Sequence, residues 1–415
     1  MDRTKPTQAS RRSVLKRSAA LATTLAAPAL LRTARAVEPV RIGSLADLSG
    51  PSSTDSGPIS IYSAQLAIED FGGQVLGRPV ELLTIDDQNN PDVGIGAARK
   101  WLDDDGASAI ISNTLSSIAI SIKKLCEDRK KVLLLGITGS SIFSQEECSP
   151  MMAIFGVNSY CMPKGVVTAL LKQGLDTWFF ISADYTFGHS LEKDATNFVR
   201  QGGGTVVGSV SFPTHSTEYS SYLLQAQASG AKVIGLAVQG TDFENLVKQA
   251  AEFQLAKFGV TIAGLFVLDN QIIGAGLNNT AGMVASGPFY WNMNDATRAF
   301  AKRIMQRSGG VAPNNVQAVP YSATMHYLRA VQAAGTLDGP TVVATMKEIP
   351  INDFWSSNVR IRDDGQALRP LYLMQVKSPA ASTSKYDIYD IRGEIPPDEA
   401  WKPLSESACP LITRK

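Results

Sequence analysis

The sequence predicts an α/β protein built on two mostly parallel β-sheets with helices on both faces. Three observations lead to this class. Short apolar runs alternate with longer stretches of helical periodicity, the alternation occurs in two successive series, and the links between the runs are short. Such alternation is typical of parallel sheets covered by crossover helices. No Pro- or Ser-rich linker separates the two series, so we expect short crossing segments to join them.

The first series begins with the apolar run VRIGSLA at residues 40–46, which predicts a strand. A helix is predicted over 59–71, where large apolar residues recur at helical spacing and share one face. The same alternation continues to residue 137. It predicts further strands at 79–86, 109–112 and 132–137, and helices at 91–104 and 117–128.

The second series repeats this pattern. Strands are expected at 178–183, 205–212, 232–238 and 262–268, and helices at 189–201, 219–229 and 242–253. Beyond Gly287 the pattern predicts helices at 295–308, 320–335 and 340–347, and strands at 359–362 and 371–377. The proline-bearing tail at 396–415 is expected to be irregular.

Residues 1–36 predict a signal peptide for twin-arginine (Tat) export to the periplasm. Adjacent Arg11 and Arg12 lie in the run SRRSVLK, an apolar stretch follows at 19–31, and the small-x-small exit ARA ends at Ala36. A membrane span needs roughly 20 apolar residues, so this shorter stretch does not predict an anchor.

The charge of the remaining chain argues against nucleic-acid binding. The whole chain has 39 Lys/Arg and 38 Asp/Glu, of which eight bases and one acid lie in residues 1–36. This leaves 31 bases and 37 acids, a net charge of −6. Binding to phosphate backbones requires clustered cations, so no nucleic-acid partner is expected. Separately, we expect the protein to be a monomer.

Enzyme signatures are absent from the sequence. There is no phosphate-binding Gly-Lys loop, no Gly-x-Ser-x-Gly elbow and no His-Glu-x-x-His pair. His189 near Asp184 is the one pair that would suit an exported hydrolase, and a histidine at a helix start explains it better. The chain is therefore expected to be no enzyme and to hold neither a metal nor a cofactor.

Four cysteines are present, and an oxidising destination favours a disulfide. We expect Cys148 to pair with Cys409, because a tail with few apolar residues frays unless it is tied. Pairing of Cys148 with Cys161 is the alternative. Cys126 falls on the apolar side of a predicted helix and is expected to be a buried free thiol.

Loops after the predicted strands are the expected ligand-binding region, because open α/β sheets bind ligands at the carboxyl ends of their strands. These loops are 47–57, 113–117, 138–141, 184–188, 239–241 and 269–272. Ser116 and Ser117 lie at a helix start. There they act either as caps alone or together with free N–H groups that suit a carboxylate.

Several segments make the chain resemble the type I periplasmic solute-binding proteins of ATP-binding-cassette (ABC) transporters, in the branched-chain amino acid branch. The segments are DLSGP at 47–51, AIEDFGG at 67–73, GRPV at 77–80, DD at 86–87 with Pro91, ADYTFG at 183–188 and AGM at 281–283. The resemblance implies two α/β lobes, three crossings at a hinge, and a ligand cleft between the lobes. The implied lobes are 37–158 plus 288–364 and 159–287 plus 365–395, with the tail after them.

The resemblance also implies a set of ligand-binding residues. A ligand carboxylate would meet Ser116, with Ser117 beside it, and the loop that holds Thr138, Gly139 and Ser140. A ligand ammonium would meet Asp269, and an aromatic contact would come from Phe187. Tyr185, near the same expected cleft, is a further candidate ligand residue. Asp55 and Gln239 stand where amino-acid binders of the family commonly have tyrosines, so the sequence departs from leucine-type specificity there.

The expected function is therefore a periplasmic receptor for a small carboxylate-bearing solute, an amino acid in the first place, which it delivers to the membrane permease of an ABC uptake transporter. Aromatic or aliphatic acids, amides and urea are the alternative ligands, and a ligand sensor is the alternative role. Aromatic residues near the expected cleft could stack a ring: Phe155, Tyr160, Tyr185, Phe187, Tyr290 and Trp291.

Overall fold

The computed structural model describes residues 37–137 and 139–412. The chain from Glu38 onward forms one compact unit. The predicted signal peptide at 1–36 and the candidate ligand residue Thr138 lie outside the described residues. Within the described ranges, no helix combines the length and the apolar character needed to cross a bilayer.

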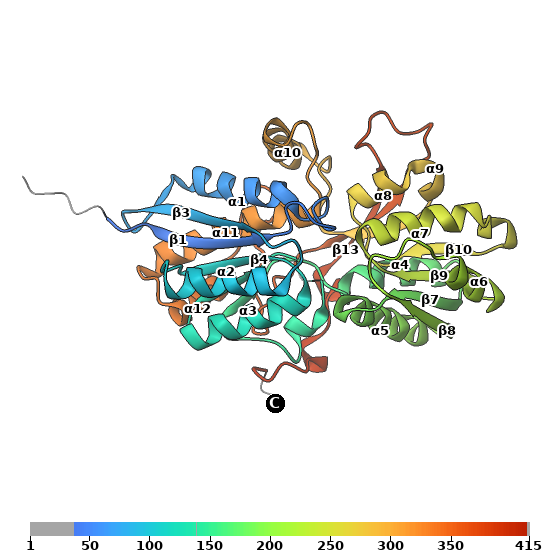
Figure 1. Ribbon diagram of the computed structural model, residues 1–415, viewed down its shortest axis with the longest axis horizontal. Helices are drawn as coiled ribbons and strands as arrows, with labels where there is room; N and C mark the ends of the chain where they lie inside the picture. The colour runs from blue at the N-terminus through green and yellow to red at the C-terminus, as the bar shows by residue number, and fades with distance from the viewer. Residues whose placement is uncertain (1–36, 138, 413–415) are drawn as a thin grey trace, which may run out of the picture. The chain divides into compact units, whose positions relative to one another are not determined.

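The first series forms a six-stranded sheet with the strand order β2-β3-β1-β4-β5-β6 (Figure 1). All pairs are parallel except β2 with β3. The strands are β1 Val40–Ala46, β2 Gln74–Val75, β3 Arg78–Asp86, β4 Ala109–Asn113, β5 Val132–Leu135 and β6 Met152–Ile154. Its helices are α1 Gly57–Phe71, α2 Pro91–Asp103, α3 Ser116–Arg129, α11 Asn315–Ala334 and α12 Gly339–Glu348.

Both faces of this sheet are buried, as the apolar runs of its strands require. Adjacent residues of β4 show this: Ile111 packs in a cluster with α1, α11 and α12, whereas Ile110 packs with α2 and α3. Each connecting helix therefore packs its apolar stripe against one face of the sheet or the other.

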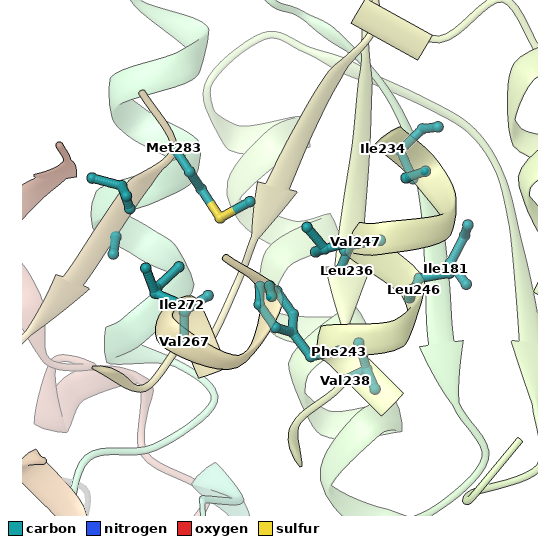
Figure 2. Packing of buried hydrophobic residues seen from close by; sticks show 14 of the residues in the cluster. Ile181, Ile234, Leu236, Val238, Phe243, Leu246, Val247, Val267, Ile272 and Met283 are labelled. Carbon is teal, nitrogen blue, oxygen red and sulfur yellow. The ribbon is translucent and has the colours of Figure 1, made fainter. Parts of the chain in front are cut away.

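The second series forms a four-stranded parallel sheet with the order β10-β9-β7-β8. Its strands are β7 Thr177–Ala183, β8 Thr205–Phe212, β9 Val233–Ala237 and β10 Thr261–Gly264. The helices beside it are α4 Cys161–Leu171, α5 Thr186–Gln201, α6 Ser220–Ala228 and α7 Gly240–Glu252. Figure 2 shows one of its cores, where strand residues Ile181, Ile234 and Leu236 pack with Phe243 and Leu246 of α7.

A three-stranded antiparallel sheet completes the fold, with β11 Val284–Gly287, β12 Leu371–Val376 and β13 Tyr389–Ile395. The remaining elements are η1 Ser141–Ser144, η2 Leu255–Phe258, α8 Asp269–Ala275, α9 Leu277–Thr280, α10 Asp295–Arg307, α13 Pro397–Ala400 and η3 Leu404–Glu406. The chain leaves the six-stranded sheet after β6, returns with α10 and α11 against α1, and leaves again before β12. The predicted α/β class with mostly parallel sheets is confirmed.

The strand predicted at 359–362 is wrong. Only isolated bridges form there, between Ile351 and Val359 and between Ile361 and Ala367. Val359 and Ile361 are buried in the core of the six-stranded sheet, whereas the arginines beside them are not. Because only one side of this segment is buried, apolar and polar residues alternate along it as they do in a strand, although it forms only isolated bridges.

Several helix starts also differ from the prediction. Helix α11 begins at Asn315, and Pro320, predicted as its start, lies inside it. The true start is a capping box in which Asn314 and Gln317 bond to each other's backbone N–H groups. Helix α5 begins at Thr186, three residues before the predicted start, and residues 269–272, predicted as a loop, form the first turn of α8.

The predicted disulfide between Cys148 and Cys409 is confirmed, with a Cα–Cα distance of 5.6 Å. The alternative pairing is wrong, because Cys161 and Cys126 are buried free thiols. Up to residue 412, where the described part ends, the predicted irregular tail contains only the short α13 and η3. A second attachment is the hydrogen bond from the Trp401 indole to the Arg369 carbonyl, at 2.7 Å.

Loss of the disulfide should destabilise the fold. We expect the double variant Cys148→Ser/Cys409→Ser to lose about 2–5 kcal/mol of unfolding free energy, because the bridge closes a loop of 261 residues in the unfolded chain. Urea denaturation with and without dithiothreitol measures this, and the variant should be insensitive to the reductant. A parent protein whose denaturation midpoint ignores dithiothreitol would contradict the prediction.

Candidate ligand-binding pocket

A cavity of about 280 Å³ lies where the carboxyl ends of strands from both parallel sheets converge. Its lining comes from the ends of seven strands and the loops that follow them: Pro51, Ser52, Asp55 and Ser56 after β1, Asn89 after β3, Asn113–Ser117 from the end of β4, Ile137 after β5, Ala183 at the end of β7 with Tyr185–Phe187 after it, Thr214 and His215 after β8, and Val238–Asp242 after β9. This is the position that parallel sheets favour for ligands.

Asn113 presents to the cavity a side-chain amide that has no hydrogen-bond partner. It is the last residue of β4 and is 1% exposed, yet neither its side-chain oxygen nor its nitrogen has a hydrogen-bond partner. Gly136 makes room for it, because a methyl group at that position would overlap the Asn113 amide. Buried polar groups in proteins are normally hydrogen-bonded, so this amide calls for a ligand or water in the cavity.

Two helix starts add further donors. Helix α3 begins at Ser116, and its N-cap Leu115 supplies no side-chain cap. Ser116 is buried and Ser117 is exposed, and both line the cavity. The first turn of a helix of this length carries free N–H groups and a positive dipole end, which suit an anion. Gln239, the N-cap of α7, adds a side-chain nitrogen that is buried without a partner.

The aromatic wall comes from the start of α5. Tyr185 is the N-cap of this helix, and its ring lies 5.9 Å from that of Phe187. Phe187 is buried edge-to-face against Phe266 at 5.1 Å and covers Gly139, where a methyl group would overlap its ring. The glycine at 139 therefore lets a ring from the loop after β7 reach across to the loop after β5.

Two carboxylates line the cavity. Burial raises the pKa of Asp55 to about 6, although hydrogen bonds from Asn270 and Gln271 act in the opposite direction. Asp242 accepts hydrogen bonds from the His215 N–H at 2.9 Å and the Tyr219 hydroxyl at 2.8 Å, so it holds the loop after β8 in place. No lysine or arginine is among the described residues that line the cavity.

The structure brings most of the predicted ligand residues together at this cavity: Asp55, Ser116, Ser117, Tyr185, Phe187 and Gln239. It does not bring Gly139, Ser140 and Asp269 there. Beyond Ile137, which lines the cavity, the loop after β5 contacts α5, where the Ser140 hydroxyl bonds to that of Ser190 at 2.8 Å. The next hydroxyl along this loop, Ser141, donates to Asp194 of the same helix at 2.7 Å.

Asp269 is buried at the start of α8 and is only 8% exposed. Its Oδ2 atom has no hydrogen-bond partner, and burial raises the pKa of this carboxyl to about 7. The buried tyrosines Tyr290 and Tyr389 lie close enough for its charge to raise their own pKa values. Asp269 therefore belongs to a buried cluster beside β13 rather than to the cavity wall.

Asn113, Asn89, His215 and Asp242 also line the cavity and were not singled out by the sequence. The signal for Asn113 was present, since it begins one of the loops named as ligand-binding. Asn89 donates to Asp47 at 3.0 Å and so ties the loop after β3 to the loop after β1, a contact that no local pattern encodes.

The described residues of the cavity wall form no catalytic set, and their arrangement suits binding. The pair of His189 and Asp184 lies at 2.8 Å with both side chains more than half exposed, and neither residue lines the cavity. Among the described residues, no three His, Cys, Asp or Glu side chains are grouped so as to hold a metal ion.

Comparison with known proteins gives consistent matches over nearly the whole described chain. A family model described as periplasmic binding protein matches residues 39–383. No curated protein matches the chain. A solved periplasmic binding protein from Burkholderia mallei is 36% identical at a TM-score of 0.88, covering 91% of this chain and 100% of that one.

Two further solved structures bear on the ligand. A branched-chain amino acid ABC transporter periplasmic ligand-binding protein from Burkholderia xenovorans is 38% identical at a TM-score of 0.82, covering 90% of this chain and 99% of that one. A solute-binding protein from Rhodopseudomonas palustris in complex with 3,4-dihydroxybenzoic acid is 18% identical at a TM-score of 0.78, covering 88% of this chain and 98% of that one. At that identity the second shows the fold alone.

The buried Asp269 carboxyl should make stability depend on pH. Its folded pKa of about 7 lies above the ordinary value of 3.8, so its contribution is fully present below about pH 4 and is lost as the pH rises through 7. We expect Asp269→Asn to gain about 2–4 kcal/mol of unfolding free energy relative to the parent between pH 4 and pH 8. Urea denaturation across this range measures the gain.

The exposed Asp363 provides the matched control, because Asp363→Asn removes the same charge from the surface. This control should not show the gain expected for Asp269→Asn. A constant difference between Asp269→Asn and the parent would show that the buried carboxyl does not titrate in this range.

Proposed function

We propose that this chain, which belongs to the family of periplasmic binding proteins of ABC transporters, is the receptor for a small carboxylate-bearing solute. An amino acid is the favoured ligand. Family membership establishes the two-lobed fold, a binding rather than catalytic role, a small-molecule ligand, a permease partner and a place outside the cytoplasm. We further propose that the receptor acts in uptake, as a monomer, in the periplasm, after export directed by residues 1–36.

The lobe boundaries remain part of this proposal. Residues 37–158 plus 288–364 hold the six-stranded sheet and its helices, and 159–287 plus 365–395 hold the other two sheets. The cavity then lies between the lobes, as closure around a ligand requires.

The observation that carries the carboxylate proposal is the bare Asn113 amide beside the start of α3. Both features offer N–H donors inside a cavity that no described lysine or arginine lines. A ligand carboxylate would accept hydrogen bonds from Asn113 and Ser116 and lie at the positive end of the helix dipole. Hydrogen bonds to a charged group are the stronger kind, so a carboxylate gains most from this arrangement.

Asp55 supports an amino acid over a simple acid. A carboxylate buried without a cation is unfavourable, as its raised pKa reflects. A ligand ammonium in the cavity would remove that cost by pairing with Asp55. The ammonium contact first expected at Asp269 is therefore proposed at Asp55, which lines the cavity where Asp269 does not. An amide or urea would bring no charge to Asp55.

Aromatic acids form a second candidate class, favoured by Tyr185 and Phe187 in the cavity wall. The Rhodopseudomonas palustris protein of the same fold is solved with 3,4-dihydroxybenzoic acid. A cavity of about 280 Å³ is near the lower end of ligand pockets and suits either an amino acid or a single ring.

A thermal-shift screen separates the two classes. The parent protein is heated with L-leucine, L-phenylalanine, their deaminated acids, benzoate and urea. We expect an amino acid to give the largest shift, since ligand at 100 times its dissociation constant stabilises by about 2.7 kcal/mol. A deaminated acid that outperforms its amino acid would transfer the assignment to the aromatic or aliphatic acids. A panel without any shift would contradict the proposed ligand class.

Removal of the donors should weaken binding. We expect Asn113→Ala, and separately Ser116→Ala/Ser117→Ala, to reduce the affinity for the amino acid that gives the largest shift by about 1.5–3 kcal/mol, the usual scale for hydrogen bonds to a charged group. Isothermal titration calorimetry measures the loss. Ser121→Ala lies on the same helix outside the cavity and should bind like the parent. Parent-like affinity in both donor variants would remove the start of α3 from the site.

A further inference from the structure

Two side-chain amides converge on the carboxylate of Asp55. Asn270 Nδ2 donates to Asp55 Oδ1 at 2.5 Å, and Gln271 Nε2 donates to Asp55 Oδ2 at 3.2 Å. Asp55 lies in the loop between β1 and α1, whereas both amides lie in the first turn of α8, which follows β10. These bonds therefore join the loop of one parallel sheet to a helix that follows the other. Neither amide residue lines the cavity.

The orientation of both amides is fixed by donors behind them. The Leu268 N–H donates to Gln271 Oε1 at 3.2 Å, so this oxygen faces away from Asp55. Asn314 Nδ2 donates to Asn270 Oδ1 at 2.9 Å, and the Asn314 oxygen accepts from a backbone N–H in turn. An amide flip would place a donor against a donor, so each amide must present its nitrogen to Asp55.

This geometry demands two acceptor atoms at position 55, and only a carboxylate offers them in a side chain of this size. The charges of Glu244 and Asp47 raise the pKa of Asp55 further, and both are negative. Neutral amides, unlike a lysine or arginine, hold the carboxylate without neutralising it. Its charge therefore stays available to a ligand in the cavity.

We propose that Asn270 and Gln271 are positioning residues that hold Asp55 as a two-acceptor carboxylate in the pocket wall and so latch α8 to the loop after β1. The consequence for a ligand rests on the proposed function, because Asp55 is there the partner of a ligand ammonium. The latch itself is a property of the protein and can be measured without knowledge of the ligand.

A donor–acceptor swap tests the latch. Asp55→Asn places an amide nitrogen against the Gln271 nitrogen, and Gln271→Glu places two carboxylates together. In the double variant the new amide donates to the new carboxylate, which still accepts from the Leu268 N–H. Net charge then equals that of the parent, and only the direction of one hydrogen bond is reversed.

Unfolding equilibria of the four proteins are measured in urea at pH 8, without ligand and with 10 mM L-leucine. We expect Gln271→Glu alone to lower the folding equilibrium constant at least tenfold, and the double variant to recover at least tenfold over the product of the two single effects in one or both conditions. Recovery of this kind distinguishes a latch from two independent structural contacts.

Matched controls are Asp363→Asn, Gln173→Glu and their combination, which make the same charge changes at exposed positions. Their effects should multiply without recovery. Equally independent effects for Asp55→Asn and Gln271→Glu in both conditions would overturn the latch. If a single variant fails to fold, a double variant that folds supports the latch, and one that also fails overturns it. A ligand panel without any thermal shift would count against the proposed function alone.

Discussion

One electrostatic constraint governs the structure: the described part of the pocket wall buries negative charge and donors that have no hydrogen-bond partner, and it buries no cation beside them. Asp55 is 3% exposed and is held by neutral amides, and Asn113 is 1% exposed without any partner. In a closed interior both arrangements are unfavourable until a second molecule completes them. A ligand with an acceptor at one end and a cation at the other, as the proposed function requires, would satisfy both at once, and its binding free energy would come largely from groups that the protein alone leaves unsatisfied.

Such a pocket needs a rigid frame, because unsatisfied groups would otherwise turn toward water. The frame consists of parallel strands buried on both faces, which fix the positions of the loops at their ends. Arg369 strengthens it where the chain leaves α12 for β12. The buried Arg369 guanidinium lies 4.6 Å from the centre of the Trp355 ring and donates to the Phe155 carbonyl at 2.7 Å. Burial lowers the pKa of Arg369 to about 10. A buried cation is thus used away from the pocket, to join segments, while the pocket itself has none among its described lining residues.

The sequence predicts the frame better than the contacts across the cavity. Periodicity located nine of the thirteen strands in the described part of the chain and most helices, and it missed the short or antiparallel strands β2, β6, β11 and β13. The rule for strand ends located the loops that hold Asp55, Ser116, Phe187 and Gln239. It could not decide which loop residues turn inward. Gly139 and Ser140 are used to contact α5, and Asp269 turns into a buried cluster, because long-range packing rather than local pattern sets these directions. Asn113 shows the same limit, since its importance depends on the absence of a side chain at Gly136, which is distant in sequence.

The choice of amides at the latch follows from the same constraint. An arginine at position 270 or 271 would hold Asp55 more strongly and lower its pKa, but it would also cancel the charge that a ligand ammonium needs. The two amides orient the carboxylate and leave its charge unpaired, so the arrangement that encloses the cavity is incomplete on its own. A ligand that supplies the cation would bind this arrangement more tightly than an arrangement in which Asp55 is exposed to water. That difference in affinity is enough to shift the population toward the arrangement that encloses the cavity. Under the two proposals, selectivity and closure would arise from one carboxylate, because the group proposed to recognise the ligand is also the group that the latch holds.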